Sequence, residues 1–192
     1  MPNVSIIEPA QYLRMPWKNG LGETLEIQKL EDNQGLRFRI SQAAVKEDGV
    51  FSNFAGLHRT LVLLSGKGMT LDHKSENSSR SHILSKVLDM ARFSGGDETH
   101  AILKNGKIED LNIMVREADT KADVYAYFAP TQFDVGNNSD NLLTAFYANQ
   151  PCEIRVNNKE TFTLEANGFL VIKQNTALCL MAGSGVFIRI TA

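Results

Sequence analysis

Apolar and polar residues alternate with a period of two along much of this chain, which is the pattern of strands that bury one face. Leu36, Phe38 and Ile40 alternate with polar residues, and Thr60–Leu64 is a continuous apolar run. The same pattern predicts further strands at 24–28, 81–87, 111–115, 124–128, 142–148, 152–156, 160–164, 169–173, 177–181 and 186–190. Helix is predicted only for a short stretch from Pro9 to Leu13.

Turns rich in glycine and asparagine separate these strands, for example at 48–49, 105–106 and 183–185. Many short strands joined by such turns are typical of a β-sandwich or a β-barrel. The polar stretch Asp72–Ser81 is predicted to be a loop within the domain.

The pattern of Leu61–Leu71 predicts a strand, a Gly-x-Gly turn and a second strand. This succession is typical of jelly-roll cupin barrels. Residues 169–190 repeat that pattern, and their strands are predicted to form the closing sheet of a similar barrel. We therefore predict an all-β bicupin, in which two jelly-roll-like β-barrels pack in one compact unit over residues 1–192. Its approximate halves are 1–110 and 111–192.

Composition fits this fold and excludes several classes of function. Hydrophobic residues make up 43% of the 192 positions, enough for a sizeable core. The net charge of −2 does not indicate the strongly basic surface expected of a protein that binds nucleic acid. There is no apolar run of about 18 residues, so no membrane span is expected. The N-terminus lacks a secretory signal, so we expect a cytoplasmic protein in which Cys152 and Cys179 are free, buried thiols.

The segment Pro16–Thr24 contains the only tryptophan of the chain, next to a lysine, an asparagine and two glycines. The glycines permit positive φ or the close approach of another group. A shaped loop carrying aromatic, cationic and amide groups suits a small polar or anionic ligand. The alternative is that Trp17 caps one end of a barrel while Lys18 is solvated.

Arg59 is the leading candidate for ligand binding, because strand alternation places it on the same face as Leu61 and Leu63. A guanidinium in an apolar cavity needs a partner, and its planar fork matches a carboxylate. The alternative partner is an internal acid: Glu26, Asp97 or Asp110.

Other polar strand residues are weaker candidates. Arg39 would either line the cavity or be solvated. Asn112 and Arg116 are predicted to belong to a polar network between the barrels rather than to a ligand site.

Neither a catalytic residue nor a metal site is predicted. The four histidines, His58, His73, His82 and His100, contain no His-x-His pair, and His73 falls in the predicted loop. A scattered site built from the other three is the weaker alternative. The chain has no Gly-x-Ser-x-Gly elbow, phosphate-binding loop or dinucleotide fingerprint, so no cofactor is predicted.

Several blocks of the chain together resemble the HutD/Ves family. They are the Trp-Lys-Asn-Gly block at 17–20, Arg-Ile-Ser-x-Ala at 39–43, Asp-Gly-x-Phe-Ser-x-Phe at 48–54, and the block at 110–116. The resemblance implies a bicupin with an accessory or regulatory role in histidine utilisation or in the response to environmental stress. No chemistry is firmly assigned to the family.

We therefore predict a metal-free protein that binds a small carboxylate ligand. The predicted ligand-binding residues are Trp17, Lys18, Asn19, Ser41, Ser52 and Arg59. No nucleic acid or membrane partner is expected, and a homodimer is one assembly open to it. Two alternatives remain: a metal-independent isomerase or hydrolase that uses Lys18 or Glu26 as acid or base, and an interaction module that only presents a surface.

Overall fold

The computed structural model describes residues 2–192, and its regular structure is almost entirely antiparallel strand, as predicted. The exception is one short 3-10 turn, Pro9–Gln11. The predicted helix is therefore shorter than expected, because Leu13 already pairs with Glu26 as the first residue of a strand. Contacts divide the described residues into a central unit, Leu13–Thr120, and a terminal unit formed by the residues up to Tyr12 together with Lys121–Ala192.

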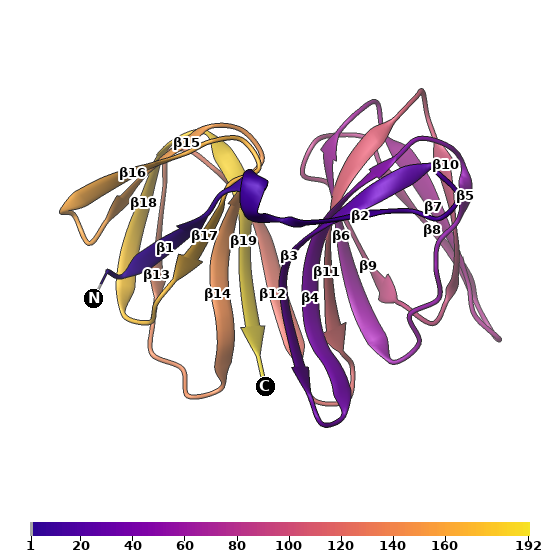
Figure 1. Cartoon of the computed structure of the whole chain (residues 1–192), viewed down its shortest axis with the longest axis horizontal. Coiled ribbons are helices and arrows are strands. Elements are labelled where there is room, and N and C mark those ends of the chain that lie inside the picture. The colour runs from indigo at the N-terminus through magenta and orange to yellow at the C-terminus, as the bar shows by residue number, and fades with distance from the viewer. Residues whose placement is uncertain (1) are drawn as a thin grey trace. The chain divides into compact units, whose positions relative to one another are not determined.

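The central unit contains two sheets (Figure 1). The six-stranded sheet runs in the order β2 (Leu13–Pro16), β3 (Gly22–Asp32), β4 (Gly35–Val45), β11 (Ile108–Arg116), β6 (Leu57–Ser65) and β9 (Met90–Ser94). The four-stranded sheet runs in the order β5 (Gly49–Val50), β10 (Glu98–Leu103), β7 (Met69–Lys74) and β8 (Ser79–Leu84).

The core of the central unit lies between these two sheets. Leu61 and Leu63 of β6 are fully buried in one cluster with Met69 and Leu71 of β7. Both sheets thus bury one face against the other, which accounts for the alternation in the sequence.

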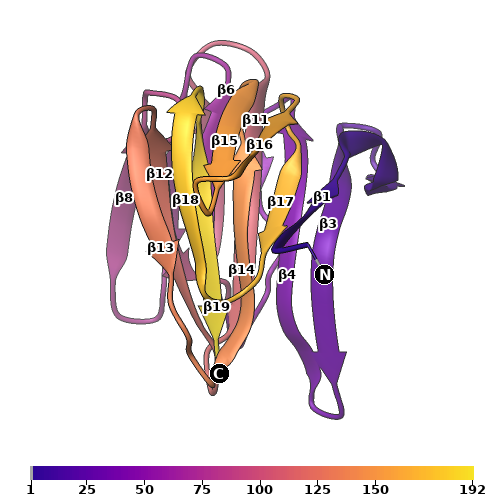
Figure 2. The ribbon, with the colours of Figure 1, turned by 90° about the vertical axis from the view of Figure 1, so that its left-hand side faces the viewer.

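The terminal unit repeats this plan with five strands facing four (Figure 2). Its larger sheet runs β1 (Val4–Ile7), β17 (Phe169–Ile172), β14 (Asn141–Ala148), β19 (Ser184–Thr191) and β12 (Lys121–Phe128). Its smaller sheet runs β13 (Thr131–Val135), β18 (Thr176–Ala182), β15 (Cys152–Val156) and β16 (Glu160–Leu164). Phe146, Ile154 and Leu180 are buried in the apolar cluster between them.

Two sequence predictions need correction. No closed barrel is found among the described residues, because each sheet ends in two edge strands and the pairing does not continue from one sheet to the other. The segment Asp72–Ser81 is not a loop, because most of it forms the β7–β8 hairpin, in which Asp72 pairs with Ser81.

The boundary of the central unit lies beyond strand β11. Ile108–Arg116 is one strand that pairs with β4 on one side and β6 on the other. It therefore belongs whole to the central unit, which ends at Thr120. Across residues 2–192, no helix has the length and apolar character needed to cross a membrane.

Both cysteines are free thiols. Cys152 is buried, and its Sγ donates to the carbonyls of Gln150 and Ser184, each at 3.2 Å, whereas Cys179 is half-buried. Burial raises the pKa of the Cys152 thiol to about 11. The reactive thiolate is therefore scarce at this position near neutral pH.

We expect a thiol-reactive dye to label Cys179 in the native protein and to label Cys152 only after unfolding. Mass spectrometry of the labelled peptides measures this directly. Equal labelling of both thiols in the native state, or a mass two protons low without reductant, would contradict the prediction.

Candidate functional site

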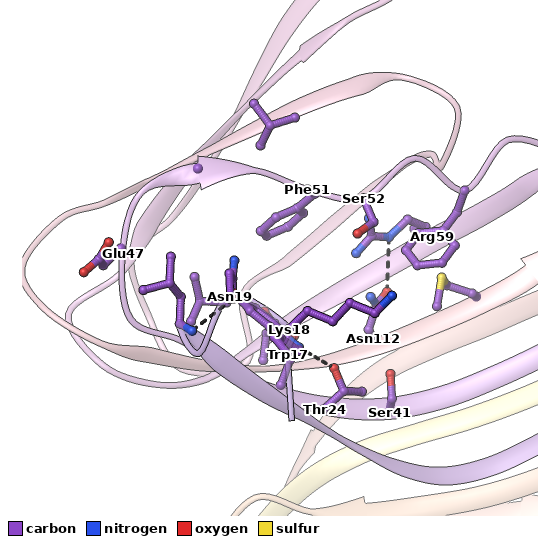
Figure 3. A pocket seen from close by; sticks show the side chains of 18 of the residues that line it. Trp17, Lys18, Asn19, Thr24, Ser41, Glu47, Phe51, Ser52, Arg59 and Asn112 are labelled. Carbon is purple, nitrogen blue, oxygen red and sulfur yellow. Dashed lines mark hydrogen bonds between the residues drawn. The ribbon is translucent and has the colours of Figure 1, made fainter. Parts of the chain in front are cut away.

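The central unit encloses an open cavity of about 550 Å³, and all six predicted ligand-binding residues line it (Figure 3). They come from four parts of the unit: the β2–β3 loop, strand β4, the segment after β5, and strand β6. The six are Trp17, Lys18, Asn19, Ser41, Ser52 and Arg59. Residues far apart in the sequence thus share one concave surface of a size typical of small-molecule sites.

Hydrogen bonds within the β2–β3 loop hold Trp17 against the cavity. Its backbone N–H donates to the Gly22 carbonyl at 3.0 Å, and Gly20, with φ of 71°, donates back to the Trp17 carbonyl at 3.0 Å. The indole Nε1 donates to Thr24 Oγ1 at 2.9 Å (Figure 3). The Asn19 side-chain oxygen accepts from the Leu21 N–H at 3.0 Å, which leaves the amide nitrogen of Asn19 as its donor toward a ligand.

Gly22 makes room for the indole. A Cβ at this position would lie 2.7 Å from two ring carbons of Trp17 and 2.5 Å from the Ala44 carbonyl oxygen. The glycine therefore serves the close packing of the tryptophan rather than an unusual φ.

Arg59 is buried at the inner end of the cavity, with 4% of its surface exposed. Its guanidinium carbon lies 5.2, 5.3 and 5.1 Å from the ring centroids of Phe51, Phe54 and Phe93, respectively. Three aromatic rings therefore surround the cation, and cation–π attraction offsets part of the cost of its burial. Burial lowers the pKa of Arg59 to about 10, while the charge of Asp110 opposes that shift. Arg59 therefore stays positively charged at neutral pH.

The guanidinium of Arg59 is only partly satisfied by protein groups. Its Nε donates to Asn112 Oδ1 at 3.4 Å (Figure 3). Neither of its two terminal nitrogens has a hydrogen-bond partner among residues 2–192, and neither is completely buried beside the cavity. Two parallel donors of a buried cation are therefore available to a ligand.

The predicted alternative, an internal ion pair at Arg59, does not occur among the described residues. Glu26 pairs instead with Arg39, from whose Nε it accepts at 2.8 Å. Asp97 lies 3.8 Å from Nη2 of Arg80. Asp110 is close enough to act on Arg59 electrostatically but makes no ion pair with it.

Strand alternation explains why Arg59 faces the cavity. As predicted, it shares the inner face of β6 with the fully buried Leu61 and Leu63. Phe93 pairs with it from β9 on one side and Met114 pairs with it from β11 on the other. The arginine thus occupies what would otherwise be a core position.

The other predicted residues surround the entrance and walls. Lys18 and Ser52 are exposed, whereas Ser41 is buried in β4. Arg39 also lines the cavity, and its guanidinium forms an ion pair with Glu26.

Sequence reasoning did not assign Asp110 or Asn112, both on β11, to the ligand site. The prediction that Asn112 and Arg116 belong to a network between the barrels is wrong for Asn112, which lines the cavity and holds Arg59. Arg116 instead binds Asp32 at 2.6 Å and Asp119 at 2.9 Å within the central unit. Asp110 is 2% exposed, and burial raises its pKa to about 7, with the charge of Arg59 opposing the shift and that of Glu109 adding to it.

The histidines lie outside the cavity lining. His73 is buried in β7 rather than exposed in a loop, and its ring nitrogens contact Thr99 Oγ1 and His82 Nδ1, both at 2.9 Å. In the part of the chain that the structure describes, no group of three or more His, Cys, Asp or Glu side chains is placed to hold a metal ion.

The chain is similar to proteins of one known family. The profile of the HutD family matches residues 9–188. An uncharacterised 21.2 kDa protein in the hutC 3′ region of Pseudomonas putida is 36% identical over 116 residues, 59% of each chain. The protein Ves of Escherichia fergusonii is 36% identical over 110 residues, 56% of each chain. The matches therefore span less than two thirds of these relatives.

Solved structures agree over the whole length. A conserved protein of unknown function from Pseudomonas aeruginosa PAO1 superimposes with a TM-score of 0.83 at 26% identity and full coverage of both chains. HutD from Pseudomonas fluorescens SBW25, solved in a formate condition, gives 0.79 at 26% identity over 98% of each chain. An oxalate decarboxylase from Lactobacillus farciminis shares the fold alone, with a TM-score of 0.64 at 8% identity over 97% of this chain and 85% of that one.

Proposed function

The chain belongs to the HutD family, and from that premise we propose that its central unit binds a small carboxylate at Arg59. The observation that carries this proposal is a buried guanidinium with two free donors and no ion pair among the described residues. A buried charge without a partner is costly, and a carboxylate supplies both the opposite charge and the matching bidentate geometry.

The remaining cavity residues complement such a ligand. Phe51, Phe54 and the Trp17 ring provide apolar walls that exclude water and strengthen the ion pair. Lys18 adds positive charge at the entrance, and Ser41 can donate a hydroxyl to the second end of a ligand. A cavity of about 550 Å³ has room for a carboxylic acid well beyond the size of formate.

The family supplies the context for this binding activity. The name of the Pseudomonas putida relative places it beside hutC, and the name HutD refers to histidine utilisation, while other relatives are called Ves. We propose an accessory or regulatory role in histidine utilisation or stress, exerted by sensing a small acid. In this proposal the two-unit chain is a bicupin, as its cupin-like structural neighbours suggest.

The site favours binding over the two alternatives. An enzyme was expected to use Lys18 or Glu26 as acid or base, but Glu26 is engaged by Arg39, and Lys18 is exposed at the entrance. A pure interaction module would need no open cavity around an unpaired arginine.

Titration with propionate, using propionamide as the uncharged control, tests the proposal. Since Trp17 is the only tryptophan and lines the cavity, its fluorescence reports occupancy. We expect saturable quenching or a spectral shift with propionate, together with stabilisation of about 2.7 kcal/mol at a hundredfold excess over Kd. Equal responses to the acid and the amide would refute carboxylate recognition, as would no response to propionate.

A further inference from the structure

Asp110 is a second buried ionisable group in the wall of the same cavity. Strand β11 holds it between Ala43 of β4 and Leu63 of β6, where its backbone is fixed by pairing on both sides. Its carboxylate makes no hydrogen bond or ion pair with the residues that the structure describes, and it is not sealed from the cavity. The group is therefore free to respond to whatever occupies the space beside Arg59.

The charge on Asp110 and the charge on a ligand compete for the same cation. Within the protein, the charge of Arg59 favours the ionised form of Asp110. A carboxylate bound to Arg59 would neutralise that charge and add a second negative charge in a site of low dielectric. Two carboxylates that share one site do not both stay ionised, because like charges disfavour each other.

We propose that Asp110 takes up one proton from solvent when a carboxylate binds at Arg59, so that the cavity binds the anion and a proton together. This inference rests on the proposed function and deepens it. The protonated carboxyl gains an O–H donor that can point at the ligand, and the complex of guanidinium, carboxylate and carboxylic acid has no net charge.

The pKa of the free carboxyl supports this linkage. Burial raises the pKa of Asp110 to about 7, and bound anion would raise it further. Affinity should therefore be highest below about pH 7, where Asp110 is already protonated. It should weaken by up to tenfold per pH unit above that value, until the pH passes the pKa of the complex.

Other charged groups lie near Asp110 or in the lining of the cavity. Glu109 is held by Ser65 Oγ at 3.1 Å and Lys107 Nζ at 3.4 Å, and Arg39 is held by Glu26. The remaining charged groups of the lining are Lys18, Glu47, Asp48 and Arg59. His73, behind the Phe93 ring, has its pKa lowered to about 4 by burial and so stays neutral in this range.

Calorimetric titration of the full chain with propionate tests the inference, from about pH 6 to about pH 9, where the probe is fully ionised. Each pH is measured in two buffers of different ionisation enthalpy, so that the difference gives the number of protons taken up. Asp110→Asn is the matched variant, because it keeps the shape and removes the titration.

For the wild type we expect Kd to rise about fivefold between pH 7 and pH 8 and about tenfold between pH 8 and pH 9, with proton uptake approaching one above pH 8. Asp110→Asn should show constant Kd and no proton uptake, and should bind more tightly than the wild type at the alkaline end. Propionate binding by the wild type with constant Kd and no proton uptake would overturn the role of Asp110 alone, as would uptake that persists in Asp110→Asn. Absence of propionate binding at every pH would instead overturn the carboxylate site itself.

Discussion

Replacing Arg59 with lysine should weaken propionate binding by about 10- to 150-fold, which corresponds to the roughly 1.5–3 kcal/mol of a charged hydrogen bond. Lysine keeps the positive charge but loses the planar fork and the stacking against the three phenylalanine rings. The measurement is the Kd from Trp17 fluorescence for the wild type and Arg59→Lys, with the melting temperature recorded for both.

A second substitution separates binding from folding. Arg59→Met removes the charge and leaves a flexible apolar side chain among aromatic rings, which is a favourable environment for a thioether. Because the guanidinium has no ion pair among the described residues, removing it strands no partner charge at contact distance. We expect Arg59→Met to fold with an unchanged or higher melting temperature and to lose propionate binding.

The contrary result would assign Arg59 a structural role. In that case the Arg59→Met protein would fail to fold, and the Arg59→Lys protein would bind propionate as tightly as the wild type does.

Gly22→Ala should both destabilise the protein and weaken the site. The added methyl would lie 2.5 Å from the Ala44 carbonyl oxygen, and β3 and β4 are paired at this point, so the backbone has little freedom to move. The Trp17 ring, 2.7 Å from the methyl, can move away, but its displacement relieves only its own contact and leaves the one with the Ala44 carbonyl. We expect a loss of about 1–3 kcal/mol in the free energy of unfolding, the usual cost of overpacking, and a displaced indole.

Gly49→Ala is the matched control, because a Cβ there has no heavy atom within 4 Å, and Gly49 has no positive φ. Its free energy of unfolding should stay within about 0.5 kcal/mol of the wild type. Denaturant unfolding measures both variants, and acrylamide quenching reports the exposure of Trp17. If Gly22→Ala matches Gly49→Ala in both measurements, the packing of the indole against Gly22 does not stabilise the loop.

The sequence was sufficient to predict the part of the site whose residues break the strand pattern. Arg59 interrupts the apolar face of β6, and Trp17 lies in a loop marked by two glycines, so both stand out without any structure. Their convergence on one cavity follows from the pairing of β3 with β4 and of β4 with β11, which connects the loop to the strand beside β6.

Asp110 and Asn112 were harder to identify, because β11 is a central strand that is buried nearly from end to end. Alternation tells which residues share a face but does not tell which buried face borders a cavity rather than a packed core. A carboxylate on such a strand reads as the partner of a cation, and only the structure shows that Asp110 lacks an ion pair with Arg59.

His73 and the β7–β8 hairpin were missed for a related reason. The polar residues of 72–81 look like a loop, yet Asp72 and Ser81 face each other across the hairpin and are joined by a hydrogen bond of 2.5 Å. His73 is buried because Thr99 and His82 satisfy both of its ring nitrogens. Local composition does not reveal such partners on other strands.

A crystal structure of the wild-type protein with saturating propionate tests the central claim most directly. The account predicts the carboxylate against the two terminal nitrogens of Arg59, within hydrogen-bond distance of both, with its alkyl chain toward the Trp17 ring. A carboxylate bound only at Lys18 or elsewhere, with the Arg59 donors facing solvent or a protein acid, would contradict it.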